Sequence, residues 1–128
     1  MKNCWYVAAY DRELEDGGPL GRTLLNEPVV LFKDSAGRAV ALEDRCCHRH
    51  LPLSLGRVVG DRLQCGYHGL EFDGTGTCVG VPGQTKVPPG ASVRTFPLVE
   101  KYGFFWIWMG DASLADETLV PDWWWVVD

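Results

Sequence analysis

The chain is built around two short stretches, CCHRH (residues 46–50) and CGYHGL (residues 65–70). Each places a histidine close behind a cysteine, as C-x-H in the first stretch and as C-x2-H in the second. Thiolate and imidazole side chains are ligands for soft and borderline metals such as iron and zinc. Two loops of this kind, facing each other, can present a cysteine pair to one metal atom and a histidine pair to another. The spacing therefore favours a dinuclear metal site.

The grouping of these ligands distinguishes an iron–sulfur cluster from zinc. A Cys2His2 zinc site uses the same residue types, but it groups cysteine with cysteine and histidine with histidine. In a Rieske [2Fe–2S] centre, two histidines replace two cysteines on one of the two irons. We therefore predict a Rieske cluster, with a structural zinc domain as the alternative. The predicted metal ligands, which are also the predicted cofactor-binding residues, are Cys46, His48, Cys65 and His68.

The sequence around these ligands resembles a known family. The segments CCHRHLPLSLG (46–56) and LQCGYHGLEFDGTG (63–76) are similar to the Rieske domain of Rieske-type non-haem iron aromatic oxygenases, of the vanillate O-demethylase and dicamba monooxygenase type. The likeness starts near Trp5, includes FFWIWMGD (104–111) and extends to VPDWWWVVD (120–128). It therefore covers nearly the whole chain.

The resemblance implies a fold and a role for the chain. The implied fold is an all-β Rieske iron–sulfur fold, in which an antiparallel β-sandwich base carries a small cluster-binding subdomain at about residues 43–82. The implied role is to accept single electrons from a reductase or ferredoxin and to pass them toward a mononuclear iron that oxygenates or demethylates aromatic compounds. Respiratory Rieske proteins carry an additional disulfide-forming cysteine pair where this chain has Leu51 and Tyr67, so the oxygenase and ferredoxin branches fit better.

The mononuclear iron site of such an oxygenase cannot be assembled from this chain. That Fe(II) needs two histidines and one carboxylate, whereas only His50 remains of the 3 histidines once the cluster has its ligands. We therefore predict no catalytic residue, leave open whether the chain alone is an enzyme, and expect residues 1–128 to be one domain, the N-terminal part of a longer oxygenase subunit. The family implies that such a subunit is a homo-oligomer, a trimer. A free-standing Rieske ferredoxin that carries electrons is the alternative.

Three residues beside the ligands are interpreted as non-ligands. Cys47 is expected to fill space in a tight loop, because cysteine outside a metal site usually acts as a small hydrophobic residue. His50 is surplus to the four ligands that a Rieske centre needs. Arg49 either contacts an acidic surface of a partner protein or is solvated.

The composition excludes several classes of protein. Apolar residues make up 46% of the chain and the net charge is −5, so the chain can bury a core and lacks the basic character of nucleic-acid-binding domains. The sequence contains no apolar run long enough for a membrane span, and its start does not read as a signal peptide. We therefore expect a cytoplasmic protein with neither nucleic-acid nor membrane partners, in which Cys4, Cys47 and Cys78 are thiols.

Short strand-like runs separated by turn residues indicate the β elements. Glycine-containing turns are expected at 34–38 and 60–61, and a turn at 101–103 is expected to join two strands within 94–111. Trp106 and Trp108 alternate with apolar neighbours on the second of these strands and are predicted to be core residues. The other predicted elements are strands at 4–10, 22–26, 28–33 and 39–44 and a single helix at 112–120.

Overall fold

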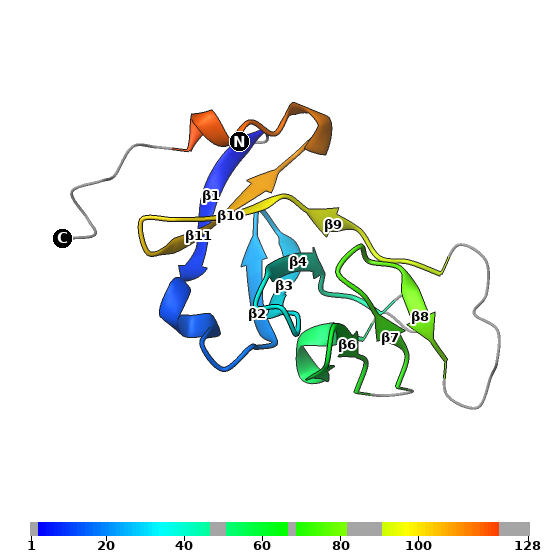
Figure 1. Cartoon of the computed structure of the whole chain (residues 1–128). Helices are drawn as coiled ribbons and strands as arrows, with labels where there is room; N and C mark the ends of the chain where they lie inside the picture. Colours follow the sequence, from blue (N-terminus) through cyan, green and yellow to red (C-terminus); the bar gives the residue numbers. More distant parts are fainter. Residues whose placement is uncertain (1–2, 47–50, 67–68, 82–90, 121–128) are drawn as a thin grey trace.

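The computed structural model describes residues 3–46, 51–66, 69–81 and 91–120. These residues form short antiparallel strands in three sheets, connected by turns and one-turn 3-10 helices, and no α-helix occurs among them (Figure 1). The predicted all-β antiparallel architecture is therefore confirmed. Within the described ranges, no helix has the length and the apolar character that crossing a bilayer requires.

The first sheet has the strand order β1-β11-β10 and joins the N-terminal segment to residues near 100. Its strands are β1 (Cys4–Tyr10), β10 (Leu98–Lys101) and β11 (Phe104–Met109). Tyr102 and Gly103 close the β10–β11 hairpin with φ angles of 58° and 79°, the left-handed geometry that suits two-residue hairpins. Trp106 and Trp108 are both buried, which confirms their assignment to the core.

The second sheet lies in the middle of the molecule, and its strand β3 has buried side chains on both faces (Figure 1). In the order β2-β3-β4-β9 it contains β2 (Leu20–Leu24), β3 (Glu27–Lys33), β4 (Ala39–Glu43) and β9 (Thr95–Phe96). Successive side chains of a strand point to opposite faces. On β3, Val29 and Leu31 therefore enter one hydrophobic core, while Val30 and Phe32 enter another.

The two cores differ in what they contain. The core that Val30 and Phe32 enter is named the thiol core, because three cysteines take part in it. The core that Val29 and Leu31 enter lies between the first two sheets and is named the base core. The thiol core comprises Val30, Phe32, Leu42, Cys46, Leu53, Leu63, Cys65, Leu70, Phe72, Cys78 and Val93. The base core comprises Ala8, Ala9, Leu14, Val29, Leu31, Ala41, Phe96, Phe105, Ile107 and Met109.

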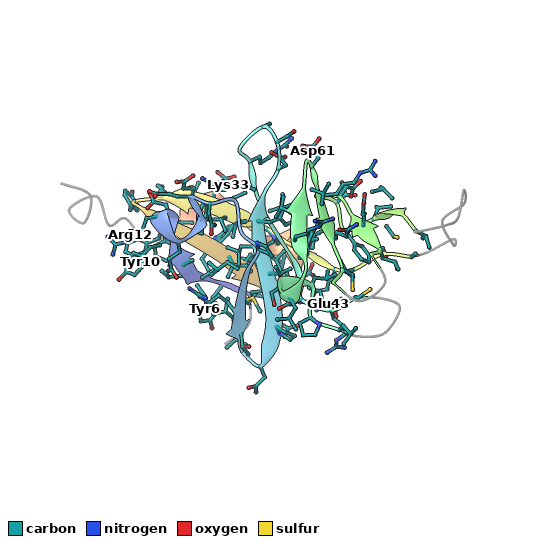
Figure 2. All side chains as sticks on the ribbon, turned by 90° about the horizontal axis from the view of Figure 1, so that it is seen from below. Tyr6, Tyr10, Arg12, Lys33, Glu43 and Asp61 are labelled. Atoms are coloured by element: carbon teal, nitrogen blue, oxygen red, sulfur yellow. The ribbon has the colours of Figure 1, made fainter. Side chains whose placement is uncertain are left out.

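The third sheet carries the second cysteine–histidine stretch. Its strands, in the order of the chain, are β5 (Arg57–Val59), β6 (Arg62–Gln64), β7 (Glu71–Phe72) and β8 (Cys78–Gly80). The predicted turn at 60–61 joins β5 to β6 and contacts the β3–β4 turn, where the N–H of Ser35 donates to Asp61 Oδ1 at 2.8 Å and the Ser35 hydroxyl donates to the same atom. Figure 2 shows Asp61 at the same end of the molecule as Lys33, the last residue of β3.

Pro97 divides a segment that the sequence predicts as one strand. β9 pairs with β4 in the second sheet, whereas β10 pairs with β11 in the first. Proline has no N–H to donate to a ladder, so pairing stops there. The carbonyl oxygen of Pro97 still accepts from the N–H of Trp108 at 3.0 Å. The segment therefore crosses from one sheet to the other.

The predicted helix at 112–120 is wrong. The structure instead has two one-turn 3-10 helices, η3 (Ala112–Leu114) and η4 (Glu117–Leu119). The side chains of Asp111 and Asp116 accept the N–H groups of Ser113 and Thr118. Such local bonds offer the backbone an alternative to a helix.

The predicted strand at 22–26 is displaced. β2 ends at Leu24, and Leu25 and Asn26 form a left-handed two-residue turn with φ angles of 50° and 63°. This turn matches the twist of the flanking strands.

Candidate metal centre

Cys46 and Cys65 lie at the ends of two different sheets and meet in one core. Cys46 follows β4 in the second sheet, and Cys65 directly follows β6 in the third. Their residues are 2% and 3% exposed, and both belong to the thiol core. The four described cysteines are thiols. Two of the predicted ligands are thus brought into the same interior region.

The loops that begin at these two cysteines are closed in the same way. The N–H of Cys46 donates to the carbonyl oxygen of Leu51, and the N–H of Cys65 donates to that of Leu70, both at 2.7 Å. In the second loop, the N–H of Gly69 also donates to the carbonyl oxygen of Cys65 at 3.0 Å. Each loop therefore starts at a buried cysteine and encloses the position of the predicted histidine ligand.

The backbone that leaves the first loop crosses directly over the start of the second. A Cβ added to Gly56 would lie 1.8 Å from the carbonyl oxygen of Gln64, and one added to Gly66 would lie 3.0 Å from that of Leu55. No side chain fits into the first of these contacts. The two loops are therefore neighbours, as a shared metal site requires.

A buried carboxyl group ties down the first loop. Asp44 lies two residues before Cys46 and is 8% exposed. Its Oδ1 accepts from the N–H of Ser54 at 2.7 Å, and its Oδ2 accepts from the Ser54 hydroxyl at 2.6 Å. The N–H of Asp44 donates to the carbonyl oxygen of Pro28 at 3.0 Å. Both ends of the loop are thereby attached to the second sheet.

The predicted histidine ligands His48 and His68 lie outside the described residues, as do Cys47, Arg49 and His50. Among the described residues, no three histidine, cysteine, aspartate or glutamate side chains converge on a point where they could hold one metal ion. The donors that are described suit one iron of a [2Fe–2S] cluster, because thiolates are its usual protein ligands and both cysteines are buried in adjacent loops.

The other two described cysteines occupy different settings. Cys78 is buried in the thiol core, but it sits on β8, paired with Phe72, and its Sγ donates to the carbonyl oxygen of Gly80 at 3.5 Å. Cys4 lies on β1 in the first sheet and is partly exposed. The N–H of Cys78 donates to the carbonyl oxygen of Ala91 at 2.9 Å, a bond that spans 13 positions, whereas the bonds that close the loops at Cys46 and Cys65 span five.

The sequence reasoning missed three residues that shape the site, Asp44, Ser54 and Gly56. A signal existed for Gly56, because an isolated glycine at the edge of a strand-like run indicates close backbone approach. The bond between Asp44 and Ser54 joins residues ten positions apart. No local pattern marks such a pair.

Comparisons with known proteins agree with this geometry. Residues 4–97 match the family model described as the Rieske [2Fe-2S] domain. The chain is 50% identical over 125 residues to the toluene-4-sulfonate monooxygenase system iron-sulfur subunit TsaM1 of Comamonas testosteroni, a match that covers 98% of this chain and 36% of that protein. It is 50% identical over 123 residues to the oxygenase component of dicamba O-demethylase from Stenotrophomonas maltophilia, with 95% and 36% covered.

A solved structure gives the same result for the fold. The crystal structure of dicamba monooxygenase bound to dicamba matches with a TM-score of 0.93 at 48% sequence identity, over 99% of this chain and 38% of that chain. The present chain thus spans little more than a third of the length of these relatives.

Proposed function

Because this chain belongs to the Rieske [2Fe-2S] domain family, we propose that it binds a [2Fe–2S] cluster and transfers single electrons within an oxygenase. The Rieske fold expected from the sequence is confirmed by the match to dicamba monooxygenase. Cys46 and Cys65 would hold one iron as thiolates, and His48 and His68 would hold the other. Residues at about 43–82 would form the cluster-binding subdomain.

The observation that carries this proposal is the pair of buried thiols on two adjacent loops of the same construction. When bound, the cluster supplies reversible one-electron chemistry. The chain would hold it between two loops whose ends are hydrogen-bonded, and the thiol core would keep water from the sulfur ligands. Histidine ligands raise the potential of such a cluster above that of an all-cysteine centre. The part of the chain described here thus supports a role in electron transfer.

The relatives suggest where the electrons come from and where they go. Their names describe an oxygenase component and the iron-sulfur subunit of a monooxygenase system. We therefore place this chain between a reductase or ferredoxin donor and a mononuclear Fe(II) in a catalytic domain, in a homo-oligomeric cytoplasmic enzyme that acts on aromatic compounds. These relatives favour the oxygenase over a free-standing ferredoxin, and the family match favours iron–sulfur over zinc.

Anaerobic reconstitution with iron and sulfide tests the proposal. We expect two irons and two sulfides per chain, visible absorption, and an electron paramagnetic resonance signal after reduction by dithionite. A colourless chain that takes up zinc instead would overturn it. With cluster bound, the chain alone should not oxygenate any aromatic compound, because its histidine count leaves no mononuclear iron site.

Single substitutions test the ligand assignment. Replacing Cys46, His48, Cys65 or His68 should prevent cluster binding, since each removes one of four bonds to iron. Cys78→Ser is the matched control, because Cys78 is equally buried in the same core. It should retain iron and sulfide, as should the serine variants of Cys4 and Cys47. Normal iron content in the His68 variant would contradict the assignment.

A further inference from the structure

Asp44 is the single charged residue that is buried in the part of the chain that the structure describes. Taking a carboxylate out of water is unfavourable unless cations or hydrogen bonds compensate for the lost hydration. Here the compensation comes from neutral groups, because the N–H and the hydroxyl of Ser54, in the middle of η2 (Leu53–Leu55), both donate to the carboxylate. None of the ion pairs among the described residues includes Asp44. Its negative charge is therefore stabilised by dipoles and not cancelled by a cation in contact with it.

The arginines that share a hollow with Asp44 do not neutralise it. Arg22 and Arg45 line this hollow together with Asp44. Arg22 is already paired with Glu13, whereas Arg45 is exposed and forms no ion pair with a described carboxylate. Water and salt screen a buried charge much less than an exposed one. The field of the Asp44 carboxylate therefore extends to its neighbours.

The attachment of the first loop does not itself require a charge at this position. An asparagine would accept the N–H of Ser54 with its amide oxygen and would donate from its NH2 group to the Ser54 hydroxyl. Both bonds between residues 44 and 54 are thus available to a neutral side chain of the same shape. What aspartate adds to asparagine here is a negative charge close to a predicted metal ligand.

This charge lies near the predicted cluster. One residue separates Asp44 from Cys46, so their Cα atoms are at most about 7.6 Å apart. With two thiolate and two neutral imidazole ligands, the oxidised cluster is neutral and the reduced cluster carries one negative charge. Asp44 therefore repels the reduced form and has little effect on the oxidised form. Over roughly 10 Å, at an effective dielectric constant of about 20, two unit charges change an equilibrium constant by about tenfold or more.

We propose that the buried carboxylate of Asp44 lowers the reduction potential of the cluster. The inference rests on the proposed function, because it concerns the cluster that the chain is proposed to bind. The cluster gains one electron from the reductase or ferredoxin donor and gives up that electron toward the mononuclear iron. Asp44 makes the first transfer less favourable and the second more favourable by the same factor. It touches no metal atom and acts through its charge.

Redox titration of Asp44→Asn tests the proposal. The cluster-loaded chain is titrated at neutral pH with dithionite and mediator dyes, and visible absorption gives the ratio of reduced to oxidised cluster. At a fixed ambient potential this ratio should be about tenfold higher in the variant, which corresponds to a midpoint potential about 59 mV higher for a one-electron couple. The difference should persist in about 1 M salt, because the substituted charge is buried. Iron, sulfide and the electron paramagnetic resonance spectrum show whether the same cluster is present.

Asp111→Asn is the matched control. Asp111 follows β11, is exposed, and accepts the N–H and the hydroxyl of Ser113 as Asp44 accepts those of Ser54. The substitution removes the same charge from the same type of bond, but beside the first sheet, which contributes no described residue to the thiol core. The ratio should stay within about twofold of the wild-type value. An equal rise in Asp111→Asn would mean that net charge alone sets the potential, and would overturn the proposal.

Ser54→Ala separates the charge of Asp44 from the attachment of the loop. It removes one of the two bonds between these residues but leaves the carboxylate in place. The ratio of reduced to oxidised cluster should therefore stay at or below the wild-type value. A rise as large as that in Asp44→Asn would show that the potential follows the attachment of the loop, and the proposal would be overturned.

A second neutral variant, Asp44→Ser, covers the case in which Asp44→Asn does not fold, and it should show the same rise. If neither variant loads a cluster although the wild type does, Asp44 acts by holding the loop, and the proposal is overturned. An unchanged or lower ratio in a loaded neutral variant overturns this inference alone. A wild-type chain that loads no cluster overturns the proposed function together with it.

Discussion

The carboxyl group of Asp44 is fully bonded although it is buried. Each of its oxygens accepts one hydrogen bond from Ser54, from the N–H at 2.7 Å and from the hydroxyl at 2.6 Å. A buried acceptor that loses its donor costs more than the bond itself contributes, because the group has already given up its water. The strength of the first loop's attachment therefore depends on one serine hydroxyl.

Ser54→Ala should lower the free energy of unfolding by about 1–3 kcal/mol, because it leaves Oδ2 of Asp44 without its donor. Urea unfolding of the cluster-loaded chain measures the change. Ser113→Ala is the control, since it removes a hydroxyl-to-carboxylate bond of 2.7 Å to Asp111 at an exposed site. That substitution should cost less than about 0.5 kcal/mol. Equal losses in the two variants would show that the burial of Asp44 is unimportant.

The ligand residues of the site could be predicted from the sequence, whereas the residues that hold the ligand loops in place could not. Cysteine and histidine at close spacing are a local pattern, and the two cysteines do lie together in one core. Asp44 and Ser54, and Gly56 and Gln64, become neighbours only after the strands have assembled. No local or periodic sequence pattern identifies residues that act through such long-range contacts.

At the scale of elements, the crossing of Gly56 over β6 fixes the distance between the two cysteine loops. Gly56→Ala should lower the free energy of unfolding by at least about 2 kcal/mol and reduce the iron content, because its Cβ would overlap the carbonyl oxygen of Gln64. Gly80→Ala is the control, since its Cβ would meet its nearest neighbour, Oε1 of Glu71, at 3.4 Å. Iron analysis and urea unfolding decide the matter, and full iron content in Gly56→Ala would contradict the expectation.

The contact between the β3–β4 and β5–β6 turns should depend on pH. The hydroxyl and then the N–H of Ser35 donate to Asp61 and hold the pKa of its carboxyl group below the ordinary value of 3.8. The folded state thus favours the ionised form. The resulting stabilisation is complete above the unfolded-state pKa and is lost as the pH falls through the lowered folded-state pKa.

Ser35→Ala should therefore lower the Tm most near pH 7, and its effect should shrink below about pH 3.8. The Tm is measured for the wild type, Ser35→Ala, Asp61→Asn and the double variant at each pH. Comparing the four as a double-mutant cycle cancels the pH effects that are common to all of them. In the Asp61→Asn background, the effect of Ser35→Ala should not vary with pH. A Ser35→Ala effect that grows on acidification would refute the coupling.

Hairpins were predictable from sequence, whereas the path between sheets was not. Turns at Gly37, Gly60 and Gly103 sit where glycine supplies a positive φ, and strands begin and end around them. The sequence does not predict that the chain passes from the second sheet to the first at Pro97, because the strand propensity of a segment does not depend on which sheet it joins. The sequence predicts a helix at 112–120 because the hydrogen bonds that the side chains of Asp111 and Asp116 accept leave no mark in hydrophobic periodicity.

At the scale of the whole molecule, β3 and β4 belong to both cores. Val30 and Leu42 enter the thiol core, while Leu31 and Ala41 enter the base core from the other face of the same sheet. Neither core can open without disturbing the second sheet. The chain should therefore unfold as one cooperative unit.

We expect visible absorbance, which reports the cluster, and tryptophan fluorescence to change at the same urea concentration. Leu31→Ala, on the face away from the cysteines, should shift both midpoints equally, with a loss of about 2–5 kcal/mol. Fully buried Leu63, in the thiol core, provides the reciprocal variant Leu63→Ala. Two separate transitions, or a Leu31→Ala effect confined to fluorescence, would show that the cores unfold independently.

The depth of the two cysteine thiols governs how iron reaches them. A carrier that hands over a preassembled iron–sulfur unit has to touch the receiving sulfurs, and residues 2% and 3% exposed do not permit that contact. Under the proposed ligand assignment, the unit enters while the core is open, on the newly made chain or during a brief opening, so that metal uptake and folding are one process. The rate of maturation then depends on how delivery compares with closure of the core, and a chain that closes first has to reopen before it can be loaded.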